Sequence, residues 1–85
     1  MKVIRMNNLE ESCPACPTIF EFDSEGNHYY FRYRWGGWKL VNQTTDEIIA
    51  SGYGTGDDYD GFCSIDDMIR WCFKAGIWLK KGKNK

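Results

Sequence analysis

Hydrophobic and polar positions alternate along residues 18–23 and, more strongly, along residues 28–35, where the odd positions from 29 onward are aromatic. Period-two alternation predicts two strands, each with one face on the core and the other toward solvent. The polar residues 24–27 between them predict a tight turn, so the two strands should form an antiparallel hairpin. The side chains expected on the core face, including one from the following strand, are Phe20, Phe22, Tyr29, Phe31, Tyr33 and Leu40.

A second hairpin is predicted at Gly36-Gly37, because two glycines between strand-like segments can both adopt the positive φ of a two-residue loop. This loop pairs Trp35 with Trp38 at the tip of the hairpin. Residues 42–46 predict a further turn, and residues 47–51 predict a fourth strand. The chain should therefore contain an antiparallel β-meander of three to four strands.

One amphipathic helix is predicted after the meander, beginning at Ser64. The segment 64–67 places a hydroxyl at the N-cap and an acidic residue three positions later, which is close to a capping box. Gly76 is a natural end for the helix. The apolar stripe has the spacing i, i+3, i+4, i+7 and consists of Ile65, Met68, Ile69 and Cys72. The expected fold class is α+β, with the meander packed on this C-terminal helix, and residues 77–79 form either a last short strand or a packed tail.

The two ends of the chain show weaker patterns. Residues 2–6 are compatible with a short edge strand, whereas residues 7–17 predict a loop, because two prolines interrupt regular structure there. Eighty-five residues allow one domain at most. We therefore expect a single domain over residues 1–85, with an irregular N-terminal segment at 1–17 and a basic tail at 80–85.

Charge is distributed unevenly, although the net charge is only −1. Residues 41–67 hold seven acidic side chains and no Lys or Arg, whereas the last twelve residues hold five lysines and no acid. The near-neutral balance argues against a general nucleic-acid binder, and the uneven distribution suits a partner that binds in one orientation. A solvated surface with a frayed basic tail is the alternative.

No apolar segment is long enough to span a membrane, and the first residues lack the apolar stretch of a signal peptide. We therefore expect a cytoplasmic protein with no membrane partner. In a reducing compartment the four cysteines should be thiols or metal ligands rather than disulfides.

Cys13 and Cys16 have the spacing of a redox or metal-binding pair. A redox pair needs a helix directly after it to lower the thiol pKa, and here a proline and a strand follow. Structural zinc is the better interpretation, with Cys63, Cys72 or His28 completing a tetrahedral site. The wide separation of Cys63 from Cys72 argues against zinc, as does the place of Cys72 on the apolar stripe, where a thiol acts as a small hydrophobic group. We expect no other cofactor.

The most specific surface feature is the solvent-facing side of the second and third strands. Arginines beside aromatic rings can stack on bases and pair with phosphates, and they serve equally well as contact residues between proteins. The alternative is a merely solvated face on which Arg32 pairs with Glu21. The candidate partner-binding residues are Tyr30, Arg32, Arg34, Trp35, Trp38 and Lys39, with Asp57, Asp58 and Asp60 from the acidic loop at 52–61.

A resemblance to known proteins rests on residues 18–22 and 29–36, which follow a pattern similar to that of small bacteriophage-encoded accessory proteins. The size, the acidic loop and the single helix on a small sheet also resemble phage anti-defence inhibitors, including anti-CRISPR proteins. The resemblance implies a non-enzymatic protein that binds and blocks a host or defence protein in the host cytoplasm. These inhibitors share no common motif, so no functional residue is carried over.

The leading hypothesis is therefore a small non-enzymatic protein-binding module of this inhibitor type. One alternative is a small single-stranded nucleic-acid-binding protein that uses the arginine face together with the lysine tail. A zinc-stabilised structural domain is another. Catalysis has little support, because His28 is the sole histidine and is predicted to lie at a hairpin turn.

Overall fold

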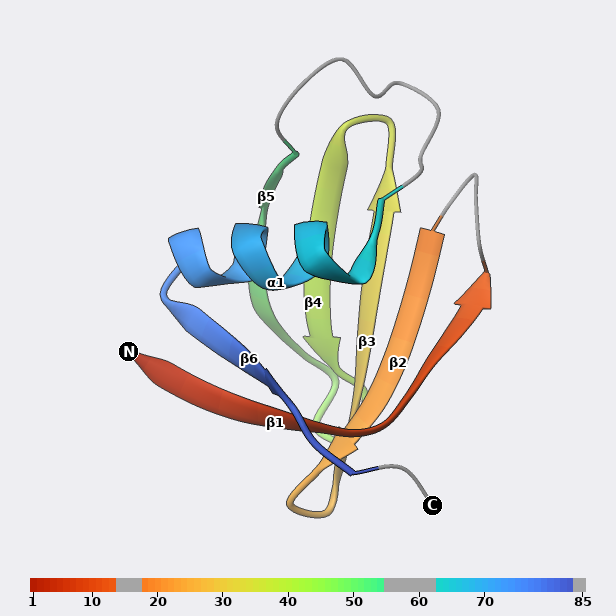
Figure 1. The fold of residues 1–85 in the computed structure, drawn as a ribbon, viewed down its shortest axis with the longest axis vertical. Coiled ribbons are helices and arrows are strands. Elements are labelled where there is room, and N and C mark those ends of the chain that lie inside the picture. Colours follow the sequence, from red (N-terminus) through yellow and green to blue (C-terminus); the bar gives the residue numbers. More distant parts are fainter. Residues whose placement is uncertain (14–17, 55–62, 84–85) are drawn as a thin grey trace.

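The computed structural model describes residues 1–13, 18–54 and 63–83, which form one mixed sheet and one helix (Figure 1). The elements are β1 (Lys2–Cys13), β2 (Thr18–Ser24), β3 (Asn27–Arg34), β4 (Gly37–Asn42), β5 (Glu47–Tyr53), α1 (Ile65–Lys74) and β6 (Ile77–Lys81). The sheet order is β5-β4-β3-β2-β1-β6, antiparallel from β1 to β5, with β6 added parallel to β1. The predicted α+β class is confirmed, and β2 to β5 form an antiparallel meander as predicted. The prediction was incomplete, because β1 and β6 extend this meander into a six-stranded mixed sheet.

The N-terminal segment 1–17, predicted to be irregular, is largely strand, because β1 extends to Cys13. Its first half pairs with β6, and its second half turns to pair with β2. Two register shifts interrupt the pairing with β2, and Asn8, which lies within the first of them, has a φ of 55°. Bulges of this kind break the alternation of polar and apolar positions, so the sequence pattern did not reveal the strand.

The basic tail predicted at 80–85 is also partly ordered, since Lys80 and Lys81 belong to β6. Beyond β6, the backbone N–H of Asn8 donates to the carbonyl of Lys83 at 2.7 Å, and that of Gly82 donates to the carbonyl of Met6 at 2.8 Å. A Cβ on residue 82 would lie 2.3 Å from the Asn7 side chain, so only glycine allows this close approach. Residues 82 and 83 are therefore held against β1 rather than frayed.

The helix forms as its sequence predicts. The Ser64 side chain accepts a hydrogen bond from the backbone N–H of Asp67, and the Asp67 carboxylate accepts one from the backbone N–H of Ser64, both at 3.1 Å. This capping box satisfies two N–H groups that the first turn would otherwise leave unpaired. Gly76 follows the helix with a φ of 91°, a conformation that favours glycine. The helix, which is the one in the described part of the chain, is not long and apolar enough to span a membrane.

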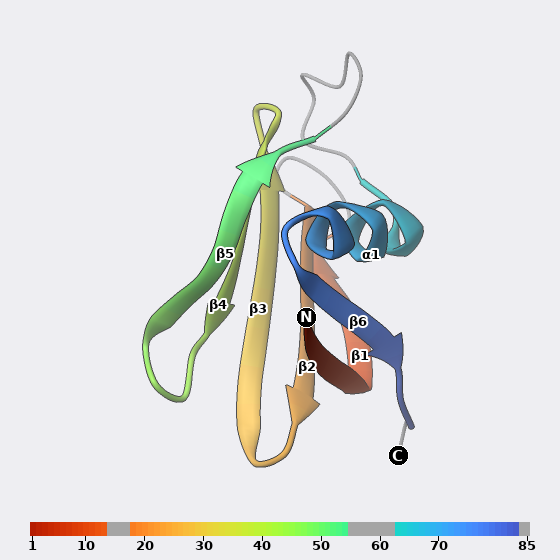
Figure 2. The same ribbon diagram turned by 90° about the vertical axis from the view of Figure 1, so that its left-hand side faces the viewer.

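The sheet curls so that β6 and the start of β1 lie across the core from β3, β4 and β5, and α1 packs in the opening (Figures 1 and 2). Trp71, which the stripe prediction missed, extends from α1 to Tyr33, with ring centroids 4.9 Å apart. A Cβ on Gly54 would lie 2.9 Å from both rings, so the chain leaving β5 passes them only as glycine. All six residues predicted for the core face are buried.

The first hairpin has the predicted register, with Phe22 opposite Tyr29. The second hairpin differs, because its two-residue loop is Trp35-Gly36 rather than Gly36-Gly37. Arg34 therefore pairs with Gly37, and Trp38 lies opposite Tyr33 instead of Trp35. The predicted exposed pair of tryptophans is thus split: Trp38 is 6% exposed and stacks on Phe31 at 5.7 Å, whereas Trp35 is 70% exposed.

The shifted register is explained by comparing the backbone strain at Trp35 with the free energy gained by burying Trp38. Trp35 takes a positive φ of 55°, which costs about 1–2 kcal/mol for a residue other than glycine. Burying the indole of Trp38 removes about 150–250 Å² from water, which stabilises the fold by about 4–6 kcal/mol at 25 cal/mol per Å². The gain from burying Trp38 exceeds the strain at Trp35.

Replacing each tryptophan tests this register. We expect Trp38→Ala to lower the free energy of unfolding by about 3–5 kcal/mol, because it leaves a cavity beside Phe31. The matched change Trp35→Ala should alter it by about 0.5 kcal/mol or less, because that ring lies in solvent. Urea denaturation followed by circular dichroism measures both. Equal losses for the two variants would contradict the shifted register.

Candidate functional site on the outer face of the sheet

The outer face of β2 to β5 carries its side chains in rows, because cross-strand partners project on the same side of an antiparallel sheet. Three groups share this face: the cationic end consists of Arg32, Arg34 and Lys39, the apolar row of Tyr30, Val41 and Ile48, and the histidine clamp of Glu21, Asp23 and His28. Charge therefore changes along the strands from positive, through apolar, to a mixed acidic group.

A hollow of about 340 Å³ lies at the cationic end. Its floor is Gly37, whose cross-strand neighbours are Arg34 on β3 and Tyr53 on β5. The arginines, Lys39 and the Tyr53 ring, which is 86% exposed, form its walls. A Cβ on Gly37 would meet only two carbonyl oxygens, at 3.7 and 3.9 Å, so the absence of a side chain there leaves the hollow open rather than relieving a clash. We call this feature the Gly37 hollow.

The cations around the Gly37 hollow have no acidic partner within the described parts of the chain, because none of the three ion pairs found there involves them. The alternative pairing of Arg32 with Glu21 does not form, since Glu21 bonds to His28 and Ser12. The Arg34 guanidinium lies over the Trp35 ring, 5.6 Å from its centroid. The cationic end therefore presents positive charge and exposed aromatic rings to solvent.

The sequence placed most of these residues correctly. Tyr30, Arg32, Arg34 and Lys39 project from the outer face, and Trp35 is exposed at the hairpin loop. Trp38 was wrongly assigned to the exposed tip, since the shifted loop buries its ring against Phe31 and leaves only part of it along the hollow. The remaining predicted contact residues, Asp57, Asp58 and Asp60, lie outside the described residues. Sequence reasoning missed Tyr53 and Gly37, which only the pairing of β4 with β5 brings together.

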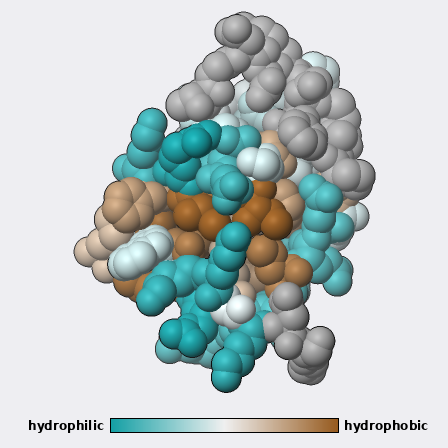
Figure 3. All heavy atoms as spheres, in the orientation of Figure 1, coloured by the Kyte–Doolittle hydropathy of each residue, from teal (hydrophilic) through white to brown (hydrophobic). Residues whose placement is uncertain are grey.

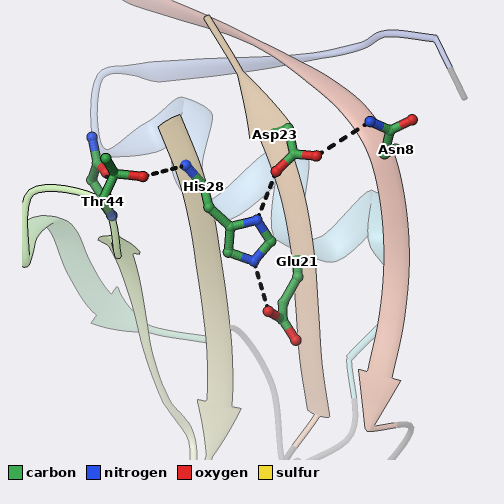
Figure 4. Close-up of polar contacts among 6 residues, drawn as sticks. Asn8, Glu21, Asp23, His28 and Thr44 are labelled. Carbon is green, nitrogen blue, oxygen red and sulfur yellow. Dashed lines mark hydrogen bonds and ion pairs between the residues drawn. The ribbon is translucent and has the colours of Figure 1, made fainter. Parts of the chain in front are cut away.

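His28 is held between two carboxylates at the other end of the face (Figure 4). Its Nε2 lies 2.7 Å from Glu21 Oε1, and its Nδ1 lies 2.7 Å from Asp23 Oδ1. The Asn8 side-chain amide on β1 donates to the second oxygen of Asp23 at 3.2 Å. The hydrogen bond that His28 donates to Glu21, followed by the one to Asp23, raises the pKa of His28 above 6.5, and the same contact with His28 lowers the pKa of Glu21 below 4.5.

The histidine clamp replaces the turn role that the sequence suggested for His28. The predicted register already paired Asp23 with His28, and Glu21 lies two residues along the same strand on the same face. That register was therefore a signal by which the clamp could have been found. Because both ring nitrogens face carboxylates, His28 links β2 to β3, and the link is an ion pair when the imidazole is protonated.

The cysteines give limited support for a metal site. In the described part of the chain, no three Cys, His, Asp or Glu side chains are arranged to hold a metal ion. Burial, together with nearby Cys63, raises the pKa of the Cys72 thiol to about 12, which disfavours the thiolate that zinc requires. Cys13 is half-buried at the end of β1. Its predicted partner Cys16 lies outside the described residues, so zinc at that pair stays a prediction.

The histidine clamp should make stability depend on pH. Since the pKa of His28 is raised on folding, its contribution is fully present below 6.5 and disappears as pH rises through the raised value. His28 is 41% exposed, so solvent screening limits the loss to about 1 kcal/mol or less. Urea midpoints between about pH 6 and pH 9 measure it. His28→Gln should flatten the decline, and an unchanged decline in that variant would show that another group titrates.

No family model matches the chain, and no curated protein or solved structure matches it, so functional conclusions rest on the geometry described above.

Proposed function

We propose that this chain is a small non-enzymatic protein-binding module that holds an acidic and partly apolar segment of its partner on the outer face of the sheet. The observation that carries the proposal is the Gly37 hollow, where three cations without acidic partners in the described residues border an exposed aromatic ring. Arginine and tyrosine are enriched among the residues that dominate the energy of protein interfaces.

The apolar row beside the cationic end favours a protein over a nucleic acid as the occupant of this face. Ile48 is 62% exposed and lies opposite Val41. A nucleic-acid backbone that runs along the strands from the cationic end would therefore place its next phosphates against apolar side chains. Farther along the strands it would meet the carboxylates of Glu21 and Asp23. Those groups repel phosphates, whereas a protein segment can match positive, apolar and acidic zones in turn.

The Gly37 hollow is suited to a single acidic side chain. A carboxylate placed over Gly37 would have guanidinium groups from β3 on one side and the Tyr53 ring on the other. Arg–carboxylate pairs form two parallel hydrogen bonds, which fix the orientation of the bound group. Aliphatic side chains of the partner would pack against Val41 and Ile48, which removes apolar surface of both proteins from water and stabilises the complex.

The resemblance to phage anti-defence proteins supports an inhibitory role for this binding. A module that covers an acidic patch of a partner can block the surface that the partner uses for another ligand. The outer face of the sheet, with the Gly37 hollow, is the contact surface for this role. Asp57, Asp58 and Asp60 do not enter it, because they lie outside the described residues.

Binding of labelled peptides tests the proposal. A peptide alternating Glu and Leu should bind the wild-type protein, and a peptide alternating Lys and Leu should not. Gly37→Val places its Cβ at ordinary contact distance from the neighbouring carbonyl oxygens and puts its methyl groups toward the hollow. This change should weaken binding at least about tenfold, as should Arg32→Glu/Lys39→Glu. Fluorescence anisotropy at low and moderate salt measures the affinities.

The matched control is Arg5→Glu/Lys80→Glu, which reverses an equal number of charges on β1 and β6. This variant should bind the acidic peptide about as well as wild type does. Equal binding by wild type and Gly37→Val would overturn the assignment of the hollow. Absence of binding to the acidic peptide, or equal binding of both peptides, would overturn the proposed function.

A further inference from the structure

A second charged surface is formed by β1, β6 and the last turn of α1. Positions 1–9 and 74–83 contain no Asp or Glu, and every one of them is described. Their six cations are exposed, and no ion pair among the described residues uses any of them. We call this surface the basic edge, with the cations Lys2, Arg5, Lys74, Lys80, Lys81 and Lys83.

The basic edge is brought together by the fold rather than by the sequence. The parallel pairing of β1 with β6 places Arg5 beside Lys80 and Val3 beside Trp78. The last turn of α1 adds Lys74 and Phe73. More than seventy residues separate Arg5 from Lys80 in the chain, so their charges form one patch only in the folded protein.

Exposed aromatic side chains lie among these cations. Trp78 is 44% exposed and Phe73 is 48% exposed, and their rings meet edge to face at 84° with centroids 6.4 Å apart. The Lys80 ammonium lies over the Trp78 ring, 5.3 Å from its centroid. Figure 3 shows this side of the molecule, with hydrophobic atoms across the middle of the face and hydrophilic atoms around them. Aromatic platforms with adjacent cations are the means by which proteins bind single-stranded nucleic acid without sequence preference.

The end of the basic edge is fixed in position before any ligand arrives. The backbone N–H of Lys83 donates to Asn7 Oδ1 at 3.0 Å, and the Lys83 carbonyl accepts from the N–H of Asn8 at 2.7 Å. The backbone of Lys83 therefore follows β1 instead of sampling many conformations. A prearranged cation loses less conformational entropy when it binds a phosphate.

We propose that the basic edge binds single-stranded nucleic acid, with the cations on its phosphates and a base against Trp78 or Phe73. The outer face lacks the uniform charge for this role, because its cations end at an apolar row and then a pair of carboxylates. The basic edge carries one sign of charge over the whole of its two segments. This inference stands apart from the proposed protein-binding function, since the two surfaces share no residue.

Titration of labelled oligo(dT) into the full chain at low salt tests the inference by anisotropy. Wild type should bind, and binding should weaken as salt rises, because phosphate contacts release counterions. Arg5→Glu/Lys80→Glu should lower the affinity at least about tenfold and reduce the magnitude of the salt slope by about 1.4, which is the loss of two phosphate contacts. Both side chains are exposed, so the variant should fold, and circular dichroism checks this.

The matched control is Arg32→Glu/Lys39→Glu, a cross-strand pair with the same charge change on the outer face. It should keep oligo(dT) binding within about twofold while losing the acidic peptide. A second matched pair compares Trp78→Ala, which should weaken the binding, with Trp35→Ala, which should not.

Four results would overturn the inference. The first is loss of binding in the outer-face pair with retention in the basic-edge pair. The second is tighter binding of a duplex of the same length than of the single strand. The third is binding of anionic phosphatidylserine vesicles without binding of oligo(dT). The fourth is the absence of any salt-sensitive binding to oligo(dT). None of these results bears on the acidic-peptide experiment, so the two hypotheses fail separately.

Discussion

The packing of α1 into the opening of the curled sheet is the interaction on which the rest of the structure depends. The Trp71 ring extends from the helix to Tyr33 in the middle of the sheet, at 4.9 Å, and both rings are almost completely buried. Without this contact the concave side of the curled sheet would be exposed to water. A chain of eighty-five residues buries too little other apolar surface to compensate for that exposure. The helix also determines where β6 begins, because the chain turns at Gly76 directly into the strand beside β1.

That arrangement divides the positive charge of the protein between two surfaces. The hairpin of β3 and β4 carries one cationic group on the convex outer face, next to an apolar row. The pairing of β1 with β6 collects the other group, and Figure 2 shows these strands across the core from β4 and β5. Net charge hides this division, since acids elsewhere reduce the total to −1. The two proposals assign one of these surfaces to a protein segment and the other to a nucleic-acid strand.

Two of the residues with a positive φ lie at the tips of hairpins, where solvent accommodates their side chains. Trp35 adopts a positive φ at the tip of the β3–β4 hairpin, and Glu25 does the same at the tip of the preceding one, each followed by glycine. Both loops thus have the dihedral pattern that matches the twist of the flanking strands. In the second hairpin this loop places Trp38 in the core. Trp35 is then the exposed indole at the tip, and it lies beside Arg34.

The sequence by itself determined the elements whose periodicity is regular. Alternation in β2 and β3 identified the core face and the outward arginines, and Ser64, Asp67 and Gly76 set the limits of the helix, because these signals act over a few neighbouring residues. Only the tertiary structure decided the course of β1, the register at Trp38 and the assembly of the basic edge. Bulges hide β1 from period-two analysis, burial of an indole outweighs local loop preference, and the parallel pairing of the two ends of the chain leaves no trace in local sequence.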